Sequence, residues 1–299
     1  MSSSTSRANR QPDAFVLPRY DEIALVLQGG GALGSYQAGV YEGLVEAGVQ
    51  PNWIAGVSIG ALNTAIIAGN APENRVAALR GFWNTICRPR DLIGGMGAWM
   101  LPALGMQEAS RKWASLWAAG LALTEGQPGF FSPRRPLPLP MAGFGKQSPD
   151  VVSYYDTAVL KETLLQFADF DRINDGDIRV SVGAVNVQSG NLVYFDNTKM
   201  RLRPEHFMAS GALPPGFPAV EIDGEYYWDG GLVSNTPLTE VLRDADQRDA
   251  LVFQVDLWSA GGMRREIFWR CPRVPRTFSI RAVRGPSPAC WRIVRKAHD

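Results

Sequence analysis

A serine flanked by glycines is the first group in this sequence whose spacing suggests chemistry. Residues 56–60 read Gly-Val-Ser-Ile-Gly, with Ser58 at the centre and Gly56 and Gly60 two positions away on either side. This spacing is typical of a sharp turn from strand to helix that exposes a nucleophilic hydroxyl, because such a turn leaves no room for β-carbons beside the serine. The structural alternative is a tight turn in which Ser58 only caps the following helix.

A glycine-rich loop precedes this turn. Gly29, Gly30 and Gly31 follow a short apolar run, and Gly29, Gly31 and Gly34 have the GxGxxG spacing of dinucleotide-binding loops. A dinucleotide site also needs an acidic residue about 20 positions further on to bind a ribose hydroxyl. Residues 51–56, where that acid would stand, contain none. The nucleotide-binding hypothesis is therefore disfavoured.

The histidines are poor candidates for a base that activates Ser58. The sequence has only His206 and His298, whereas an α/β-hydrolase needs a serine, an acid and a catalytic histidine in that order. His206 lies in a predicted short helix and is typical of a structural or surface histidine, and His298 is the penultimate residue. Only one clear strand precedes the segment that leads into Ser58, which also disfavours that fold.

The elements that must position these residues alternate between strand and helix. An apolar run at 23–27 predicts a buried parallel strand, and a helix over 32–47 follows the glycine loop and ends before Gly48. A second strand at 53–55 leads through the serine turn into a second helix at 59–68. This repeated pattern predicts an α/β fold with a mainly parallel sheet. Both glycine turns then lie at the carboxyl ends of strands, where functional groups of such folds collect.

The second half of the chain adds further strands and helices to this pattern. One of its strands ends in Asp229, directly before Gly230 and Gly231. Taken alone, Asp229 is an acid that caps the turn before these glycines. One predicted helix has Asp156 as its N-cap and ends at residue 167, and another runs from 237 to 245. Strands are predicted at 178–187, 192–195 and 251–255, and a hairpin at 221–228.

Composition divides the chain into a body and two unlike ends. We expect a flexible polar leader at 1–20, a domain at 21–260 and an atypical segment at 261–299, which has ten basic and two acidic residues although the whole chain carries a net charge of only +1. Within the domain, 91–150 is rich in Gly, Pro, Met and Trp. It is a cap over an apolar pocket, an interface-binding element or a locally packed insertion.

Bulk properties exclude several classes of protein. The sequence has three widely spaced cysteines, Cys87, Cys271 and Cys290, which form no CxxC pair, and only two histidines. We therefore expect no metal site and no disulfide framework. The near-zero net charge gives no reason to expect a nucleic-acid partner. No signal peptide or membrane-spanning run is evident. We therefore expect a cytoplasmic protein.

Three motifs in order resemble the patatin-like phospholipase family. They are QGGGALG at 28–34, GVSIG at 56–60 and DGG at 229–231. Secondary similarity runs from Ala209-Ser210-Gly211 through Pro214 to Asn235-Thr236-Pro237, and the resemblance covers about 23–257. It implies a three-layer α/β/α fold with a mainly parallel central sheet.

The resemblance also implies a Ser–Asp dyad, which accounts for the missing catalytic histidine. Ser58 would be the nucleophile and Asp229 the general base, in a reaction that cleaves a lipid ester through an acyl-enzyme. The backbone amides of Gly29, Gly30 and Gly31 would form the oxyanion hole. The glycines of the two turns, Gly56, Gly60, Gly230 and Gly231, would support these groups. No cofactor is implied, and a membrane or lipid inclusion is a further contact surface to consider.

Two features depart from the family pattern. Leu33 stands where many members carry Arg or Lys, so an electrostatic role of that position is not expected here. The Arg-rich segment at 261–299 replaces ordered structure, and we expect it to be truncated or frame-shifted relative to relatives; the competing interpretation is a basic tail for an anionic membrane or nucleic acid. The alternative function is a catalytically impaired, lipid- or membrane-binding homologue that lacks a complete C-terminal region.

Overall fold

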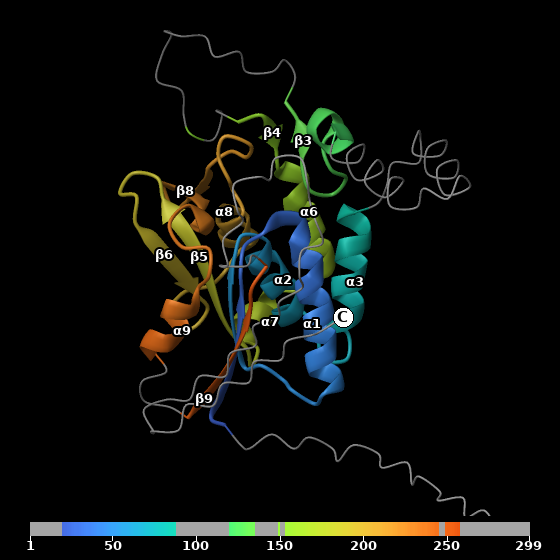
Figure 1. Ribbon diagram of the computed structural model, residues 1–299. Helices are drawn as coiled ribbons and strands as arrows, with labels where there is room; N and C mark the ends of the chain where they lie inside the picture. Colours follow the sequence, from blue (N-terminus) through green and yellow to red (C-terminus); the bar gives the residue numbers. More distant parts are fainter. Residues whose placement is uncertain (1–19, 88–119, 135–148, 150–152, 245–248, 258–299) are drawn as a thin grey trace, which may run out of the picture.

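A mixed β-sheet with helices on both faces forms the centre of the protein (Figure 1). The computed structural model describes residues 20–87, 120–134, 149, 153–244 and 249–257. The sheet order is β7-β8-β5-β2-β1-β9, and β6 pairs with β5. Its strands are β1 (Glu22–Leu27), β2 (Trp53–Val57), β5 (Arg179–Asn186), β6 (Leu192–Asp196), β7 (Val220–Ile222), β8 (Glu225–Asp229) and β9 (Ala250–Val255). The predicted α/β class is confirmed, with β9, β1, β2 and β5 as its parallel part.

The two faces of the sheet carry unequal helical layers. Leu25 and Ile54 face the larger layer, whereas Ala24 and Val26 face α9, where Val241 packs on them. This alternation follows from the two-residue period of a strand. The larger layer contains α1 (Ser35–Glu46), α2 (Ile59–Ala68), α3 (Arg75–Ile86), α6 (Ala158–Phe167), α7 (Phe170–Asp175) and α8 (Pro204–Ser210), and the other face is covered by α9 (Leu238–Asp244).

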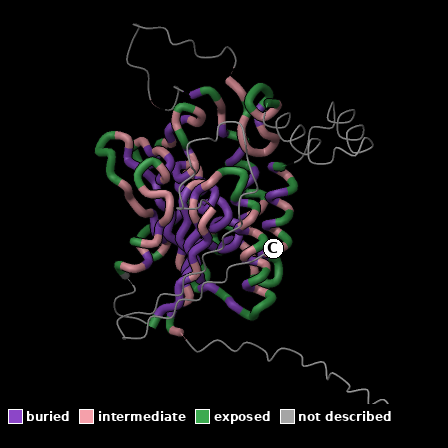
Figure 2. Tube along the Cα trace, in the orientation of Figure 1, coloured by how far each residue is buried: buried purple, intermediate pink, exposed green. Residues whose placement is uncertain are grey.

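Helix α2 lies at the centre of the molecule, in the purple interior of Figure 2. Every residue from Ile59 to Ala68 is buried. Apart from Asn63 and Thr64 the helix is apolar, and such a helix is stable only when it is enclosed. Helix α2 is enclosed by the sheet and by α1, α3, α6 and α8. Ser58, directly before it, is therefore anchored to a fully buried part of the core.

Strand β5 organises the sheet because two strands share one of its edges. Strand β2 pairs along the first part of β5, up to Val57 opposite Gly183. Strand β8 runs in the opposite direction and pairs further along, with Asp229 opposite Ala184. Since β6 pairs with the same stretch of β5, it must occupy the other edge. Strands β2 and β8 thus meet end to end, and their last residues face adjacent positions of β5.

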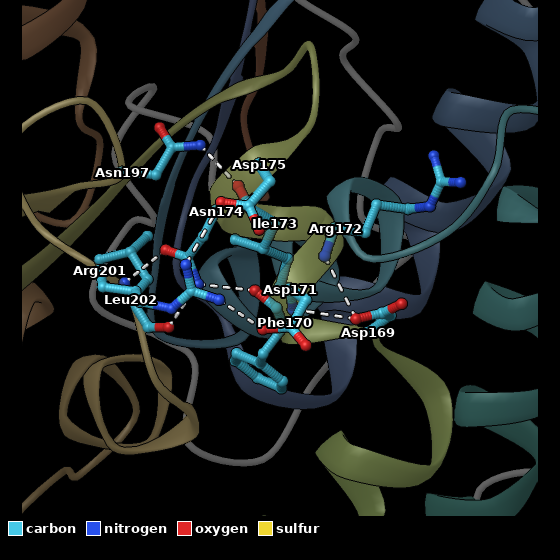
Figure 3. Close-up of polar contacts among 10 residues, drawn as sticks. All are labelled: Asp169, Phe170, Asp171, Arg172, Ile173, Asn174, Asp175, Asn197, Arg201 and Leu202. Carbon is cyan, nitrogen blue, oxygen red and sulfur yellow. Dashed lines mark hydrogen bonds and ion pairs between the residues drawn. The ribbon is translucent and has the colours of Figure 1, made fainter.

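A network of amide side chains closes the amino-terminal edge of the sheet (Figure 3). Asn197 Nδ2 donates to the carbonyl oxygens of Ile173 and Ile178, at 2.7 and 2.9 Å. Asn174 bonds both backbone groups of Leu202, and Arg201 pairs with two acids of α7, Asp171 and Asp175. A hollow of about 690 Å³ lies beside this network. Its asparagines are committed to backbone groups, so their role is structural.

The predicted elements are confirmed in type, with two corrections of boundary. The helix expected over 32–47 begins as the 3₁₀ turn η1 (Gly31–Gly34) and becomes α-helical only in α1. Asp156, predicted as an N-cap, lies in β4 (Tyr155–Asp156), which pairs with β3 (Ser132–Pro133); Thr157 is the N-cap of α6. Asp156 Oδ1 nevertheless accepts a hydrogen bond of 2.7 Å from Ala158 N.

The two expected terminal segments and most of the expected cap lie outside the described residues. The structure describes none of 261–299 and only residue 20 of the leader. Of the segment at 91–150 it describes 120–134 and 149. Within the part of the chain that is described, no helix is long and apolar enough to cross a membrane.

Candidate active site

Ser58 occupies a strained turn between β2 and α2. Its φ of 56° and ψ of −126° place a non-glycine residue in a region that L-residues rarely adopt, at a cost of roughly 1–3 kcal/mol. A β-carbon at Gly56 would lie 2.5 Å from the carbonyl oxygen of Gly60, and one at Gly60 would lie 2.2 Å from that of Leu27. The turn can therefore form only because both flanking positions are glycines.

The hydroxyl of Ser58 points at the carboxylate of Asp229. Ser58 Oγ donates a hydrogen bond of 2.6 Å to Asp229 Oδ2. The other carboxylate oxygen, Oδ1, accepts 2.7 Å from Gly231 N, in the 3₁₀ turn η2 (Gly230–Leu232). Asp229 N donates to the carbonyl of Ala212 at 3.0 Å. Both the backbone and the side chain of Asp229 are thus fixed, with one oxygen left for Ser58.

Burial decides the protonation chemistry of Asp229. The residue is only 2% exposed, and this desolvation raises the pKa of Asp229 from 3.8 to about 6, against the hydrogen bonds from Ser58 and Gly231, which lower it. The ion pairs of the described residues do not include Asp229. A carboxylate with a pKa of this kind is mostly ionised at neutral pH and is a stronger base than an exposed aspartate.

The glycine loop lies against Ser58 from the side of β1. A β-carbon at Gly29 would be 3.1 Å from Ser58 Cβ. Gly29 N donates to the carbonyl oxygen of Asn235 at 3.0 Å, so this amide already has an acceptor. The amides of Gly30 and Gly31 donate to no acceptor among the described residues. The loop thus presents two backbone donors at the start of η1, the arrangement that suits a bound anion.

The family of the chain follows from a comparison with known proteins. The model of the family described as patatin-like phospholipase matches residues 25–242, which is most of the chain. The chain belongs to the patatin-like phospholipase family. The resemblance inferred from the three motifs is therefore confirmed, and the matched range contains Ser58, Asp229 and the glycine loop.

Two solved structures are similar to this patatin-like chain. VipD from Legionella pneumophila is 17% identical, with a TM-score of 0.41, over 82% of this chain and 51% of VipD. The type III effector protein ExoU is 18% identical, with a TM-score of 0.26, over 81% of this chain and 49% of ExoU. The chain therefore spans about half the length of each of these proteins. No curated protein sequence matches it.

Ser210 is a site residue of this patatin-like chain for which the sequence predicted no role. It is fully buried at the end of α8, and its Oγ accepts a 2.9 Å hydrogen bond from Ser58 N. The same hydroxyl donates 2.6 Å to the carbonyl of Gly183 on β5. Ser210 therefore ties the strained turn to the strand that orders the sheet. In the sequence, only the family similarity around 209–211 drew attention to this residue, and that similarity did not indicate which residues Ser210 contacts.

A buried chain of amides holds the glycine loop from behind. Gln37 Nε2 donates to the carbonyl of Gln28 at 2.6 Å, and Asn63 Nδ2 donates to the carbonyl of Gly34 at 2.9 Å and to Gln37 Oε1 at 2.8 Å. Trp83 Nε1 completes the chain by donating to Asn63 Oδ1. Both ends of the loop are thus fixed to α1 and α2.

His206 serves the structure of α8. It is 2% exposed, its Nδ1 accepts from Arg203 N at 2.8 Å, and its ring packs on Phe195. Burial lowers the pKa of His206, which keeps the ring neutral at neutral pH. His298 lies outside the described residues. The hydrogen-bond partner of the Ser58 hydroxyl is thus an aspartate.

Exposed apolar side chains stand next to the site. We call Leu33, Leu213, Leu232 and Val233 the apolar rim; they are between 44% and 57% exposed. Each lies next to a site group along the chain: Leu33 is in η1 after the glycine loop, Leu213 follows the carbonyl that fixes Asp229, and the other two follow Gly231. The rim residues are therefore close neighbours, along the chain, of the backbone groups that hold the Ser58–Asp229 pair.

Proposed function

We propose that this protein is a serine lipid acyl hydrolase that cleaves carboxylic esters with Ser58 as nucleophile and Asp229 as general base. The family acts on lipids, and the 2.6 Å hydrogen bond from Ser58 Oγ to Asp229 Oδ2 carries the assignment. A serine hydroxyl is a weak nucleophile unless a base accepts its proton, and nucleophile and base must lie within hydrogen-bond reach. The pair meets this requirement without a histidine.

The proposed reaction has two halves. Ser58 Oγ attacks the ester carbonyl carbon while its proton passes to Asp229 Oδ2. The amides of Gly30 and Gly31 stabilise the oxyanion, a contribution worth roughly 100- to 1,000-fold in rate for each donor. Asp229 returns the proton to the departing alcohol as the acyl-enzyme ester forms. Asp229 then takes a proton from water, whose oxygen attacks the acyl carbon, and the proton returns to Ser58 as the fatty acid leaves.

We propose that the protein binds its substrate at a lipid surface. The apolar rim supports this, because apolar side chains around a reactive site favour an acyl chain over a sugar or a charged metabolite. A cytoplasmic location with peripheral contact to a membrane or lipid inclusion is consistent with it. The proposed chemistry uses no metal or cofactor.

The experiment that tests this function is active-site labelling combined with an ester panel. The full-length protein should react with a fluorophosphonate probe at Ser58 and hydrolyse short- and long-chain esters. Ser58→Ala should abolish labelling, and Asp229→Asn should reduce turnover by at least about 1,000-fold, since the nucleophile loses its base. Ser189→Ala and Asp171→Asn, on exposed segments, are the matched controls and should remain fully active.

Two results would overturn the proposal. Retention of full ester turnover by Ser58→Ala or Asp229→Asn would show that this pair is not the catalytic dyad. Wild-type protein that binds lipid vesicles but neither labels nor turns over any ester would instead favour a lipid-binding protein without catalysis.

A further inference from the structure

Asn235 joins the glycine loop to the Asp229 turn. Its main-chain carbonyl accepts from Gly29 N at 3.0 Å, and its side-chain Nδ2 donates to Gly29 O at 2.8 Å. A single residue thus binds both backbone groups of Gly29. The two residues are 206 positions apart in the sequence, so this clamp connects segments that share no local structure.

The side chain of Asn235 fills space that glycines leave open. A β-carbon at Gly29 would lie 2.1 Å from Asn235 Oδ1. A β-carbon at Gly231 would lie 2.9 Å from the same oxygen and 3.0 Å from Asp229 Oδ1. The amide of Asn235 therefore lies between Gly29 and Gly231: its Nδ2 donates to Gly29 O, and its Oδ1 occupies the space beside both glycines.

The geometry of the peptide bond lets the hydrogen bond from Asn235 to Gly29 O also orient the N–H of Gly30. The carbonyl of Gly29 and the N–H of Gly30 belong to one peptide unit, which is planar and, in the trans form, directs the two groups to opposite sides. When Asn235 Nδ2 holds Gly29 O, the plane is fixed and Gly30 N–H points away from Asn235. The loop glycines have no side chains that could restrict this rotation.

We propose that Asn235 is a positioning residue that aims the Gly30 amide at the oxyanion while keeping the space beside Asp229 free of a second charge. This inference rests on the proposed function of Ser58 and Asp229. An asparagine meets both needs, because it supplies an N–H donor to Gly29 O and remains neutral. Aspartate has the same shape but no donor, and a second carboxylate within about 6 Å of Asp229 raises the pKa of the first.

The test compares Asn235→Ala and Asn235→Asp with the wild-type full-length protein on a soluble short-chain ester. Removing the donor should lower kcat by at least about tenfold in both variants while KM changes by no more than about threefold, because the oxyanion exists only in the transition state. Only Asn235→Asp should also move the acidic limb of the kcat/KM profile to higher pH. Asn191→Asp, at an exposed turn, should change neither.

The outcomes separate this inference from the function on which it rests. Wild-type kcat in a folded Asn235→Ala, or an unmoved pH profile in Asn235→Asp, would overturn the role of Asn235 and leave the dyad intact. If both variants fail to fold, a crystal structure of the wild-type fluorophosphonate adduct decides: the phosphoryl oxygen should lie within hydrogen-bond distance of Gly30 N, and its placement elsewhere would overturn the inference. A wild-type protein that neither labels nor turns over esters would remove both proposals.

Discussion

Asp229 is nearly inaccessible to water and yet must carry a charge in order to act as the base that we propose. Three hydrogen bonds fix it in place, but only those from Ser58 and Gly231 reach its carboxylate. Two neutral donors compensate for only part of the lost hydration of an anion. The outcome is a carboxylate whose basicity is raised by burial and whose direction is fixed by the turn that follows it.

Activity should therefore depend on pH through a single acidic ionisation. Burial raises the pKa of Asp229 to about 6, and only the ionised form accepts the proton of Ser58. We expect kcat/KM to fall about tenfold per pH unit below pH 6 and to be level above it. The check is a profile on a soluble ester from pH 4.5 to 8.5, with unfolding followed in parallel. A level profile down to pH 4.5 would contradict the role of Asp229.

The same burial should lower the free energy of unfolding when Asp229 is ionised. Because the pKa of Asp229 rises from 3.8 to about 6 on folding, the folded state binds more protons in this window, and stability is lost as the pH rises through it, by on the order of 2–3 kcal/mol. Asp229→Asn has no carboxylate at this position, so its stability should not fall in this way. It should be more stable than the wild type at pH 8 and equal to it near pH 4, as measured by urea unfolding; equal stability at both pH values would contradict the shift.

At the scale of elements, the β2–α2 turn depends on close backbone approach. Gly60→Ala would press a β-carbon into the carbonyl of Leu27, 2.2 Å away, and should destabilise the protein by about 3 kcal/mol. Gly43→Ala is the matched control, because Gly43 also lies in a helix but has nothing within 4 Å of its β-carbon position. It should stabilise by about 0.5–1 kcal/mol. Thermal unfolding of both variants tests this, and equal effects would argue against the close approach.

Features encoded by local pattern were predictable, and features made by distant contacts were not. Helix α2 was predicted with the bounds observed, because its apolar run and its flanking glycines are adjacent in the chain. The end-to-end meeting of β2 and β8 was not predicted, since strand partners depend on packing across the whole sheet. Ser210 and Asn235 reach the site through hydrogen bonds that span 152 and 206 positions. No local spacing records such contacts.

The glycine loop is a second case in which the sequence did not predict a contact with a distant residue. The motif predicted three equivalent amides at Gly29, Gly30 and Gly31, because a repeated residue type offers no reason to separate them. In the structure Gly29 N is engaged by Asn235. The oxyanion donors that we propose are accordingly Gly30 and Gly31, whose amides stand at the start of η1.

At the scale of the whole molecule, the two edges of the sheet have opposite character. Three residues of the exposed apolar rim, Leu33, Leu232 and Val233, follow the carboxyl ends of β1 and β8 along the chain. The amino edge carries the asparagine network and the ion pairs of Arg201 shown in Figure 3. The lipid contact that we propose would therefore involve the edge that holds Ser58.

Substitution of the rim should therefore separate lipid binding from chemistry. Leu213→Ser, Leu232→Ser and Val233→Ser combined should weaken binding to phosphatidylcholine vesicles by at least about tenfold, through loss of buried apolar area, while turnover of a soluble ester stays within about twofold. Leu165→Ser with Met200→Ser removes exposed apolar residues elsewhere and should leave binding unchanged. Vesicle co-sedimentation measures both, and equal binding by all three proteins would contradict a role for the rim.

The shared edge of β5 also governs when the protein becomes able to react during its synthesis. Ser58 and Asp229 are 171 positions apart, so in a growing chain the proposed nucleophile is present long before the proposed base. Pairings between distant segments form late because they close the longest loops. We expect a chain released before residue 225 to leave Ser58 unlabelled by a fluorophosphonate. On the proposed function, a chain assembled in this order would hydrolyse no ester until β8 has joined the sheet.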